Sequence, residues 1–235
     1  MRPGYLGAMP RTHPPTLITL ARATMRAHAL IPRGSSVLVA VSGGPDSMAL
    51  LHVLALLRGR LAFGLFAHGV DHGLRPSSSM ELDLAERFAA SLDVPFGRTR
   101  VLVGAGGNLQ ARARTARWEA LRAASSHVGA DRIATGHHAD DRAETVLIRI
   151  LRGTGARGLR VLQPHQGDRI RPFVYARRSD VDAHVARHRV PHAIDPSNRD
   201  PRFLRTRVRY EAIPALESLC PRVVEHFCRL ADDLS

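Results

Sequence analysis

Apolar residues in the first half of the chain alternate between short continuous runs and helically spaced rows. The run from Val37 to Val41 is continuously apolar, which is typical of a strand buried on both faces of a parallel sheet. The segment from Met48 to Leu57 instead repeats apolar residues at helical spacing, with four leucines on one side. The sequence from Val37 to Leu57 therefore predicts a strand, a polar loop and a helix.

The same rhythm continues to about residue 152. It predicts strands over 61–68, 94–103 and 132–135, and helices over 78–92, 108–128 and 140–152. Alternating units of this size predict an α/β fold, with a doubly wound parallel sheet of the Rossmann-like kind. Ligands bind such sheets beyond the carboxyl ends of the strands, so the chemistry is expected in the loops 42–47, 68–75 and 135–141.

The rhythm changes after Gly158. We expect a last strand over 170–174, a helix over 179–188 capped by Ser179, and a helical C-terminal region broken near Pro221. No apolar run reaches the roughly 18 residues that a membrane span needs, and the Pro- and Gly-rich N-terminus lacks the apolar core of a secretory signal. No membrane association is expected.

The charge of the chain is strongly positive. It has 34 basic and 21 acidic residues, a formal net charge of +13, and no lysine, so every basic residue is arginine. Permanently charged guanidinium forks suit phosphate backbones, although a GC-rich coding bias explains the arginine excess equally well. The absence of lysine excludes a Schiff base, a covalent lysyl-AMP and a Walker-type phosphate-binding lysine.

Only two cysteines occur, Cys220 and Cys228, and they form no C-x-x-C pair. This pattern disfavours a disulfide framework, an iron–sulfur site and a cysteine nucleophile. Both thiols are expected to be structural, and a reducing cytoplasm is the expected compartment.

The strongest motif follows the first strand, before the first long helix. Its members are Ser42, Gly43, Gly44, Pro45, Asp46 and Ser47. The glycines let backbone N–H groups approach an anion, the helix N-terminus favours negative charge, and the hydroxyls can donate to phosphate oxygens. Asp46 would repel phosphates unless Mg²⁺ lies between them, so it is the expected metal ligand for Mg²⁺-ATP. The alternative is a glycine turn with an Asp/Ser helix cap.

This loop resembles that of the PP-loop ATP pyrophosphatases, which split ATP between its α and β phosphates. Further segments resemble, in the same order, the tRNA(Ile)-lysidine synthetase family within that superfamily. They are 70–75, 108–118, 136–155, 170–172 and 195–214.

The resemblance implies a C–N bond-forming ligase. ATP would adenylate the C2 oxygen of the wobble cytidine in a CAU-anticodon tRNA(Ile). The ε-amine of free lysine would then displace AMP to give lysidine. It also implies a domain organisation, with a flexible tail over 1–20, a PP-loop catalytic domain over 21–215 and a helical segment over 216–235. The family's usual C-terminal domains would be absent, with dimerisation as one way to hold tRNA.

Three residues of the 135–144 region are candidates for the second half-reaction. His137, Asp141 and Glu144 would share one side of a helix beginning there. Asp141 and Glu144 are expected to grip the lysine ammonium, and His137 or Asp141 could take its proton.

Arginines supply the remaining candidates. The family places one arginine of the 108–118 segment at the active site, and either Arg114 or Arg117 matches it. Arg205, Arg207 and Arg209 lie in the basic C-terminal region and are the expected tRNA contacts. Trp118 stands where the family commonly has tyrosine.

Three rival functions remain open. A PP-loop tRNA thiolase is disfavoured because the cysteines are few. A GMP or NAD synthetase would act on small molecules, for which the +13 charge has no use. A catalytically dead tRNA-binding module is disfavoured because Asp46, His137, Asp141 and Glu144 are all present.

Overall fold

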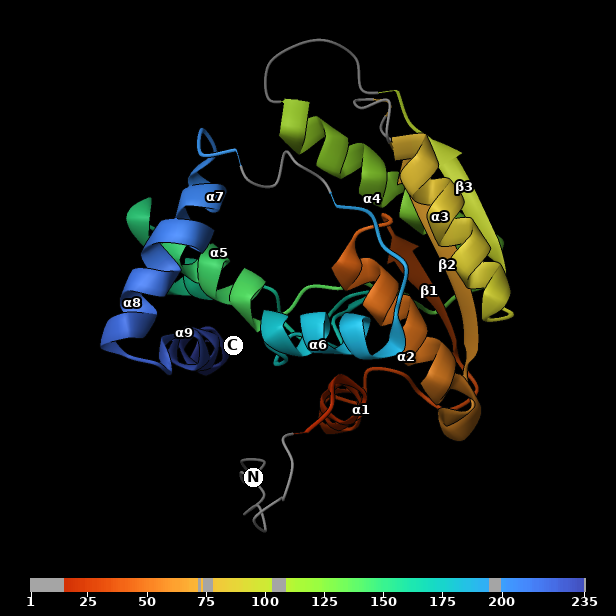
Figure 1. The fold of residues 1–235 in the computed structure, drawn as a ribbon, viewed down its shortest axis with the longest axis horizontal. Coiled ribbons are helices and arrows are strands. Elements are labelled where there is room, and N and C mark those ends of the chain that lie inside the picture. The colour runs from red at the N-terminus through yellow and green to blue at the C-terminus, as the bar shows by residue number, and fades with distance from the viewer. Residues whose placement is uncertain (1–14, 72, 74–77, 103–108, 195–199, 235) are drawn as a thin grey trace.

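The sheet of the protein has six strands in the order β3-β2-β1-β4-β6-β5. The computed structural model describes residues 15–71, 73, 78–102, 109–194 and 200–234 (Figure 1). All pairings are parallel except that of β5 with β6. The strands are β1 (Ser36–Val41), β2 (Gly64–Asp71), β3 (Phe96–Arg100), β4 (Arg132–Ala134), β5 (His165–Gln166) and β6 (Arg169–Ile170).

Helices cover both faces of the sheet, as the alternating pattern predicts. The helices are α1 (Leu17–Ala27), α2 (Pro45–Leu61), α3 (Ser78–Ser91), α4 (Leu109–His127), α5 (Ala139–Leu151), α6 (Arg178–His188), α7 (Leu204–Arg207), α8 (Ile213–Leu219) and α9 (Val223–Asp233). The described residues also contain two shorter helical segments, the 3₁₀ turn η1 (Ala156–Leu159) and the π-helical turn η3 (Val208–Ala212).

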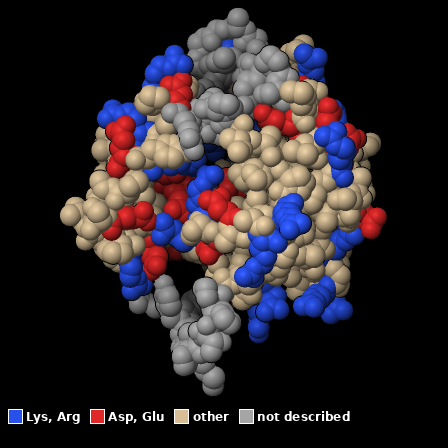
Figure 2. Space-filling view, in the orientation of Figure 1, with Lys and Arg blue, Asp and Glu red and all other residues tan. Residues whose placement is uncertain are grey.

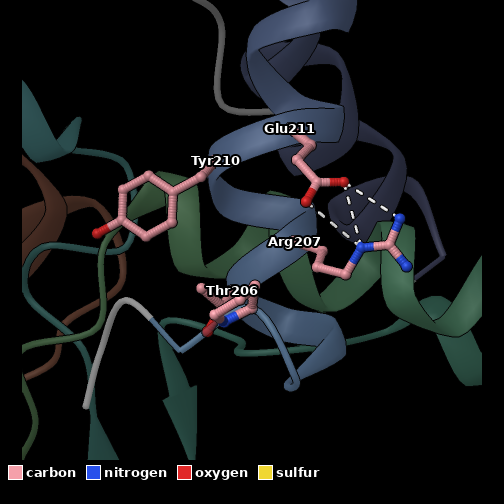
Figure 3. Close-up of a pocket in the computed structure, with 5 residues that line it drawn as sticks. Thr206, Arg207, Tyr210 and Glu211 are labelled. Carbon is pink, nitrogen blue, oxygen red and sulfur yellow. Dashed lines mark hydrogen bonds and ion pairs between the residues drawn. The ribbon is translucent and has the colours of Figure 1, made fainter.

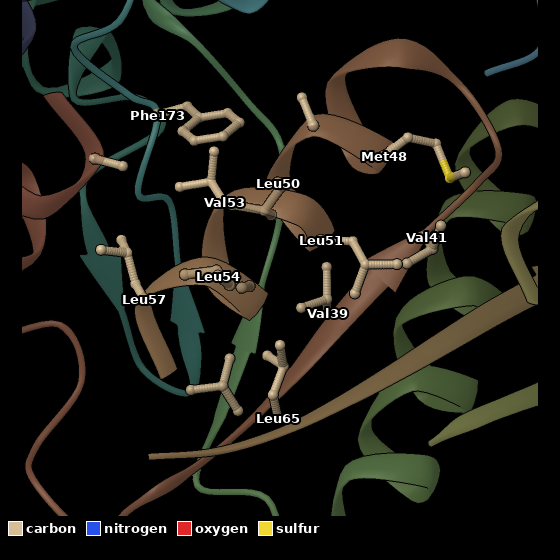
Figure 4. Packing of buried hydrophobic residues seen from close by; sticks show 14 of the residues in the cluster. Val39, Val41, Met48, Leu50, Leu51, Val53, Leu54, Leu57, Leu65 and Phe173 are labelled. Carbon is tan, nitrogen blue, oxygen red and sulfur yellow. The ribbon is translucent and has the colours of Figure 1, made fainter. Parts of the chain in front are cut away.

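Alternate residues of β1 enter two separate cores. Val39 and Val41 pack with leucines of α2 in the larger core, which also takes residues from α1, α3 and α6 (Figure 4). Leu38 and Ala40 point to the opposite face, where Leu121 of α4 covers them. Since successive side chains of a strand point to opposite faces, a continuous apolar run is what this two-sided burial requires. The predicted doubly wound α/β fold is confirmed.

The last helices form a third layer beside α5 and away from the main sheet (Figure 1). Val224 and Cys228 of α9 pack against Ala139 and Ala143 of α5. A fully buried arginine, Arg142, strengthens this contact by donating from Nη2 to Asp232 Oδ1 at 2.6 Å. The expected break near Pro221 is present between α8 and α9.

Several elements begin or end at other residues than the predicted segments do. The expected tail over 1–20 overlaps α1, where Leu17 and Ala21 are buried in the main core. Residue 216, the expected domain boundary, lies inside α8. Strand β2 begins three residues later than predicted because α2 continues to Leu61.

Two further expectations differ beyond β4. The strand predicted over 170–174 is reduced to β6, which pairs with β5 as a short hairpin. Helix α6 starts one residue before Ser179, and its N-cap is Arg177 instead. Parts of the predicted ligand loop 68–75 and of the family-like segments 108–118 and 195–214 lie outside the described residues. None of the described helices is long and apolar enough to cross a membrane.

Candidate active site

The glycine loop joins the carboxyl end of β1 to the first turn of α2. Gly43 has φ +80°, and a Cβ placed there would lie 2.7 Å from the carbonyl oxygen of Glu81 in α3. Only glycine fits this close approach. Gly44 is the N-cap of α2 and Pro45 occupies its first turn, so the free N–H groups of a 17-residue helix start at this loop. An anion is favoured at this position.

Two serines close the loop on itself. Ser47 Oγ accepts from the backbone N–H of Ser42 at 3.1 Å and donates to the carbonyl of Gly44 at 3.0 Å. Ser42 is exposed, with its hydroxyl 3.3 Å from that of Ser47. These bonds hold the turn before α2 in place, and phosphate binding by the loop stays a prediction.

One carboxylate oxygen of Asp46 has no hydrogen-bond partner. Its Oδ1 atom is buried and accepts no hydrogen bond, and its closest cations are His138 at 3.9 Å and Arg178 at 4.0 Å. Burial raises the pKa of Asp46 above its usual range, and the neighbouring charge of Asp141 acts in the same direction. An unpartnered carboxylate oxygen beside a phosphate loop fits Mg²⁺, which proteins hold with one or two carboxylates and substrate phosphates. Among the described residues no group of three or more His, Cys, Asp or Glu could hold a metal by itself.

The loop after β4 touches the phosphate loop directly. A Cβ at Gly136 would lie 2.7 Å from the carbonyl oxygen of Asp46, so only glycine allows the two backbones to meet. Adjacent parallel strands β1 and β4 thus bring their carboxyl-end loops together.

His138 connects the two halves of the site. Its Nε2 atom lies 3.9 Å from Asp46 Oδ1 and 3.5 Å from Asp141 Oδ2, and the residue is fully buried. Its Nδ1 atom accepts from the backbone N–H of Asp141 and caps α5. Burial lowers the pKa of His138, but the charges of Asp141, Asp140 and Asp46 together raise it. His138 therefore caps α5 and also lies between the carboxylates of Asp46 and Asp141.

His137 differs from its predicted setting. Helix α5 begins at Ala139, so His137 lies in the preceding loop and does not share a helical face with Asp141 and Glu144. Its Nδ1 atom lies 2.9 Å from Thr135 Oγ1. Burial lowers the pKa of His137 to about 4, partly offset by Asp141, so the imidazole is neutral near pH 7.

Asp141 and Glu144 lie one turn apart on α5, as predicted. The side chain of Glu144 is only 2% exposed and that of Asp141 11%. Both carboxylates bind the same two guanidinium groups. Arg205 reaches Glu144 from Nε at 2.8 Å and Asp141 from Nη2 at 2.9 Å, and Arg209 reaches them at 2.5 and 3.0 Å.

The charges around Asp141 keep it ionised. Although burial raises its pKa, His138, Arg205 and Arg209 lower it well below the usual range. A carboxylate with so low a pKa is a poor proton acceptor but a good ligand for a cation. This favours binding of an ammonium group over general-base catalysis at Asp141.

Asp140 has a different task. It receives both Nε and Nη2 of Arg177 and the backbone N–H of Arg178 at 2.7 Å. Arg177 also binds Glu217 of α8 at 2.6 Å. This network holds α5, α6 and α8 together below the site.

The two candidate arginines of α4 are distinguished by their surroundings. Arg114 is exposed, whereas Arg117 is half-buried and its charge contributes to the lowered pKa of His137. These surroundings favour Arg117 over Arg114 as the active-site arginine, which stays a prediction.

The expected tRNA-binding arginines are engaged within the chain. Arg205 and Arg209 hold the two acids of α5, and Arg207 pairs with Glu211 at 3.2 Å on the surface. Sequence spacing gave no sign of the pairing with Asp141 and Glu144, because the partners are more than sixty residues apart.

A pocket of about 420 Å³ lies over η3, lined by Pro201, Thr206, Arg207, Tyr210 and Glu211. In Figure 3 the Arg207–Glu211 ion pair lies on one side and the Tyr210 ring points away from it. The pocket thus belongs to the segment that carries Arg205 and Arg209. Figure 2 shows, between the helical layers, a hollow where acidic and basic side chains lie together.

Comparison with known proteins agrees with this geometry. A PP-loop domain model matches residues 19–216. The tRNA(Ile)-lysidine synthase of Thermobifida fusca is 40% identical over 222 residues, covering 93% of this chain and 68% of the relative. The chain belongs to the tRNA(Ile)-lysidine synthase family. Two other synthases of the family, from Thermotoga maritima and Geobacillus kaustophilus, are 34% and 36% identical over 86% and 90% of the chain.

The chain spans about half the length of the Thermotoga and Geobacillus relatives. Among solved structures, the U34-tRNA thiolase NcsA from Methanococcus maripaludis has a TM-score of 0.77 at 20% identity, covering 93% of this chain and 78% of that one. At that identity the likeness shows the PP-loop fold alone.

Proposed function

We propose that this chain catalyses the formation of lysidine on a CAU-anticodon tRNA(Ile), with ATP and free lysine as co-substrates. One observation carries the proposal: His138 contacts Asp46 of the phosphate loop and Asp141 of the acidic pair. The anion-binding loop and the carboxylates suited to an amine therefore face one site. Family membership supplies the expected reaction for this arrangement.

In the first step the phosphate loop holds the nucleotide. Backbone N–H groups at the start of α2 and the exposed hydroxyl of Ser42 would bind phosphate oxygens, while Ser47 supports the loop through its bonds to Ser42 and Gly44. Mg²⁺, when bound at Asp46, would offset negative charge on the phosphates. The cytidine O2 attacks the α-phosphorus, an O–P bond forms, and the bond to the leaving pyrophosphate breaks.

In the second step Asp141 and Glu144 hold the amine. The lysine nitrogen, after losing a proton, attacks C2 of the activated cytidine, and AMP leaves with the O2 atom. His137 or Asp141 would accept this proton, and of the two His137 has the higher pKa, about 4, whereas the pKa of Asp141 is held well below its usual range. Arg117 is positioned to stabilise negative charge on the departing phosphate.

A PP-loop tRNA thiolase is the second candidate function, since such an enzyme shares the fold. The curated sequence relatives favour it less, because the reported matches are lysidine synthases. The two cysteines also lie in the C-terminal helical layer: Cys228 is buried in α9 and Cys220 follows α8. Neither lies on the loops that form the site.

The proposal places the enzyme in the cytoplasm and is tested by its substrate requirements. Pyrophosphate release from ATP and Mg²⁺ should depend on an isoleucine tRNA transcript bearing CAU, and AMP release should depend on lysine as well. Release that needs sulfide in place of lysine, or a small acid in place of tRNA, would overturn the assignment.

A further inference from the structure

A row of arginines lies along the seam between α4 and β6. Residues 114, 118 and 122 are four apart and therefore share one side of α4. The guanidinium of Arg169 in β6 stacks 3.6 Å above the Trp118 ring. Arg122 reaches Asp168 at 3.3 Å, and Arg169 reaches the same acid at 3.8 Å. One carboxylate thus serves two arginines.

At the Arg114 end of this row, no carboxylate among the described residues balances the positive charge of the arginines. Among the described residues, neither Arg114 nor Arg117 lies within ion-pairing distance of a carboxylate. Arg171, at the end of β6, is 3% exposed, donates from Nη1 to the carbonyl of Gln163 at 2.5 Å, and has a buried Nε without a partner. Burial, and then the charges of Arg169 and Arg114, lower the pKa of Arg171 to about 10.

The arginines near α7 contrast with this row. Arg202, Arg205, Arg207 and Arg209 each pair with a carboxylate of the chain. Their charge is already compensated, whereas the α4–β6 row carries excess positive charge. An external anion therefore gains more at the α4–β6 row than at α7.

The row also leads toward the reactive loop. Arg171 directly follows β6, whose Ile170 carbonyl accepts from the backbone N–H of Thr135 in the active-site loop at 3.1 Å. The charges of Arg171 and Arg117 also lower the pKa of His137. From Arg114 to Arg122 the helix rises about 12 Å, at 1.5 Å per residue, which matches roughly three to four nucleotides at about 3.4 Å each.

We propose that the α4–β6 row, with Arg114, Arg122 and Arg169 at its surface, binds the phosphate backbone of the RNA strand next to the reacting nucleotide. Half-buried Arg117 and buried Arg171 add fixed positive charge behind it. The inference rests on the proposed function for the identity of the RNA, and it assigns RNA contacts to residues other than Arg205, Arg207 and Arg209. Contacts of this kind position a nucleic acid without reading its sequence.

The test compares two double variants that remove the same charge. Arg122→Gln/Arg169→Gln removes two members of the row, and Arg22→Gln/Arg26→Gln removes two exposed arginines of α1. Binding of a fluorescent, unmodified CAU-bearing tRNA(Ile) transcript is measured by anisotropy between 50 and 200 mM salt. The row variant should bind at least about tenfold more weakly at 100 mM salt, and its salt slope should fall by about 1.4–1.8, since each lost contact removes about 0.7–0.9.

The α1 variant should bind within about twofold of wild type. Because Arg169 packs on Trp118, the pair Arg114→Gln/Arg122→Gln repeats the test without disturbing that stack. A fluorescent ATP analogue should bind all variants equally. Equal weakening by the α1 pair, wild-type RNA binding by both row variants, or loss of nucleotide binding instead of RNA binding would each overturn the inference.

RNA binding by the row and incorporation of lysine can be tested separately. If RNA binding falls as expected but lysine is not incorporated by wild type, the proposed function fails and the binding row remains. If lysine is incorporated but the row variants bind RNA normally, the row is not the RNA surface.

Discussion

The carboxylate of Glu144 lies 2.8 Å from Nε of Arg205, a residue sixty-one positions later in the chain. Arg209 holds the other oxygen of the same carboxylate. Two cations of the protein thus occupy the acids that are proposed to bind the substrate's ammonium. The charge of the site is balanced before lysine arrives, and the amine must share or replace these partners.

Removing the charge of Glu144 should weaken lysine binding. We expect Glu144→Gln to raise the KM for lysine by at least about tenfold and to lower the free energy of unfolding by about 1–3 kcal/mol, because two guanidinium groups lose an anionic partner. Steady-state kinetics and urea unfolding measure the two effects. Glu211→Gln, which breaks only the surface pair with Arg207, should change stability by less than about 0.5 kcal/mol. Equal lysine KM values for both variants would contradict the role of Glu144.

Removing the charge of Arg205 should strengthen lysine binding. The guanidinium of Arg205 competes with an ammonium for Asp141 and Glu144, so Arg205→Gln should lower the KM for lysine by about three- to tenfold at saturating tRNA and ATP. Arg202→Gln, which affects the exposed pair with Asp200, serves as the control. If Arg205 instead binds RNA, the KM for tRNA will rise and that for lysine will stay constant.

Asp46 should matter for chemistry and little for RNA. Asp46 belongs to the phosphate loop and its buried Oδ1 accepts no hydrogen bond, so Asp46→Asn should reduce pyrophosphate release at least about 100-fold. Binding of tRNA, measured by anisotropy, should stay within about twofold. Asp93→Asn is a matched control, because Asp93 is exposed with φ +51°, a conformation that Asn tolerates. Equal loss of both activities would mean that Asp46 has a structural role.

Much of this site follows from sequence because its parts are local. The loop from Ser42 to Ser47 needs only a strand, paired glycines and a helix start, which lie together along the chain. Its contact with the loop after β4 follows from the rule that parallel strands share a carboxyl edge. The resemblance to a family then supplied the reaction.

The errors arise where distant contacts decide the structure. The pairing of Arg205 and Arg209 with the acids of α5 depends on how the last helices pack, and no local pattern encodes it. His138 is not among the predicted site residues, because a helix cap and a histidine between two carboxylates look alike in sequence. Helix α1 escaped prediction because it follows a Pro- and Gly-rich stretch, although Leu17, Ala21 and Met25 recur at four-residue spacing.

A histidine pair outside the site should make stability depend on pH. His184 Nε2 lies 2.9 Å from His52 Nδ1, and burial, followed by the charges of His188 and His52, lowers the pKa of His184 to about 4. In the unfolded chain this pKa is about 6.5, so the unfolded state binds more protons between pH 6.5 and 4. The free energy of unfolding should therefore fall by about 2 kcal/mol from pH 7 to 4.5.

Urea unfolding at both pH values measures this dependence. His184→Leu should remove about 2 kcal/mol of this dependence and leave the part that comes from His137, whose pKa is also lowered to about 4. His127→Gln, which alters an exposed histidine at the end of α4, should leave the dependence unchanged. A pH dependence that is the same in His184→Leu and in wild type would assign it to other groups.

The most direct test of the account follows labelled lysine. Purified protein with ATP, Mg²⁺ and a tRNA(Ile) transcript bearing CAU is incubated with radiolabelled lysine, and the tRNA is recovered and counted. We expect radiolabelled lysine attached to the tRNA with wild-type protein and almost none with Asp46→Asn or Glu144→Gln. No label should be attached when the wobble cytidine is replaced by uridine. If wild-type protein that is folded and binds ATP leaves the tRNA unlabelled, the proposed function is contradicted.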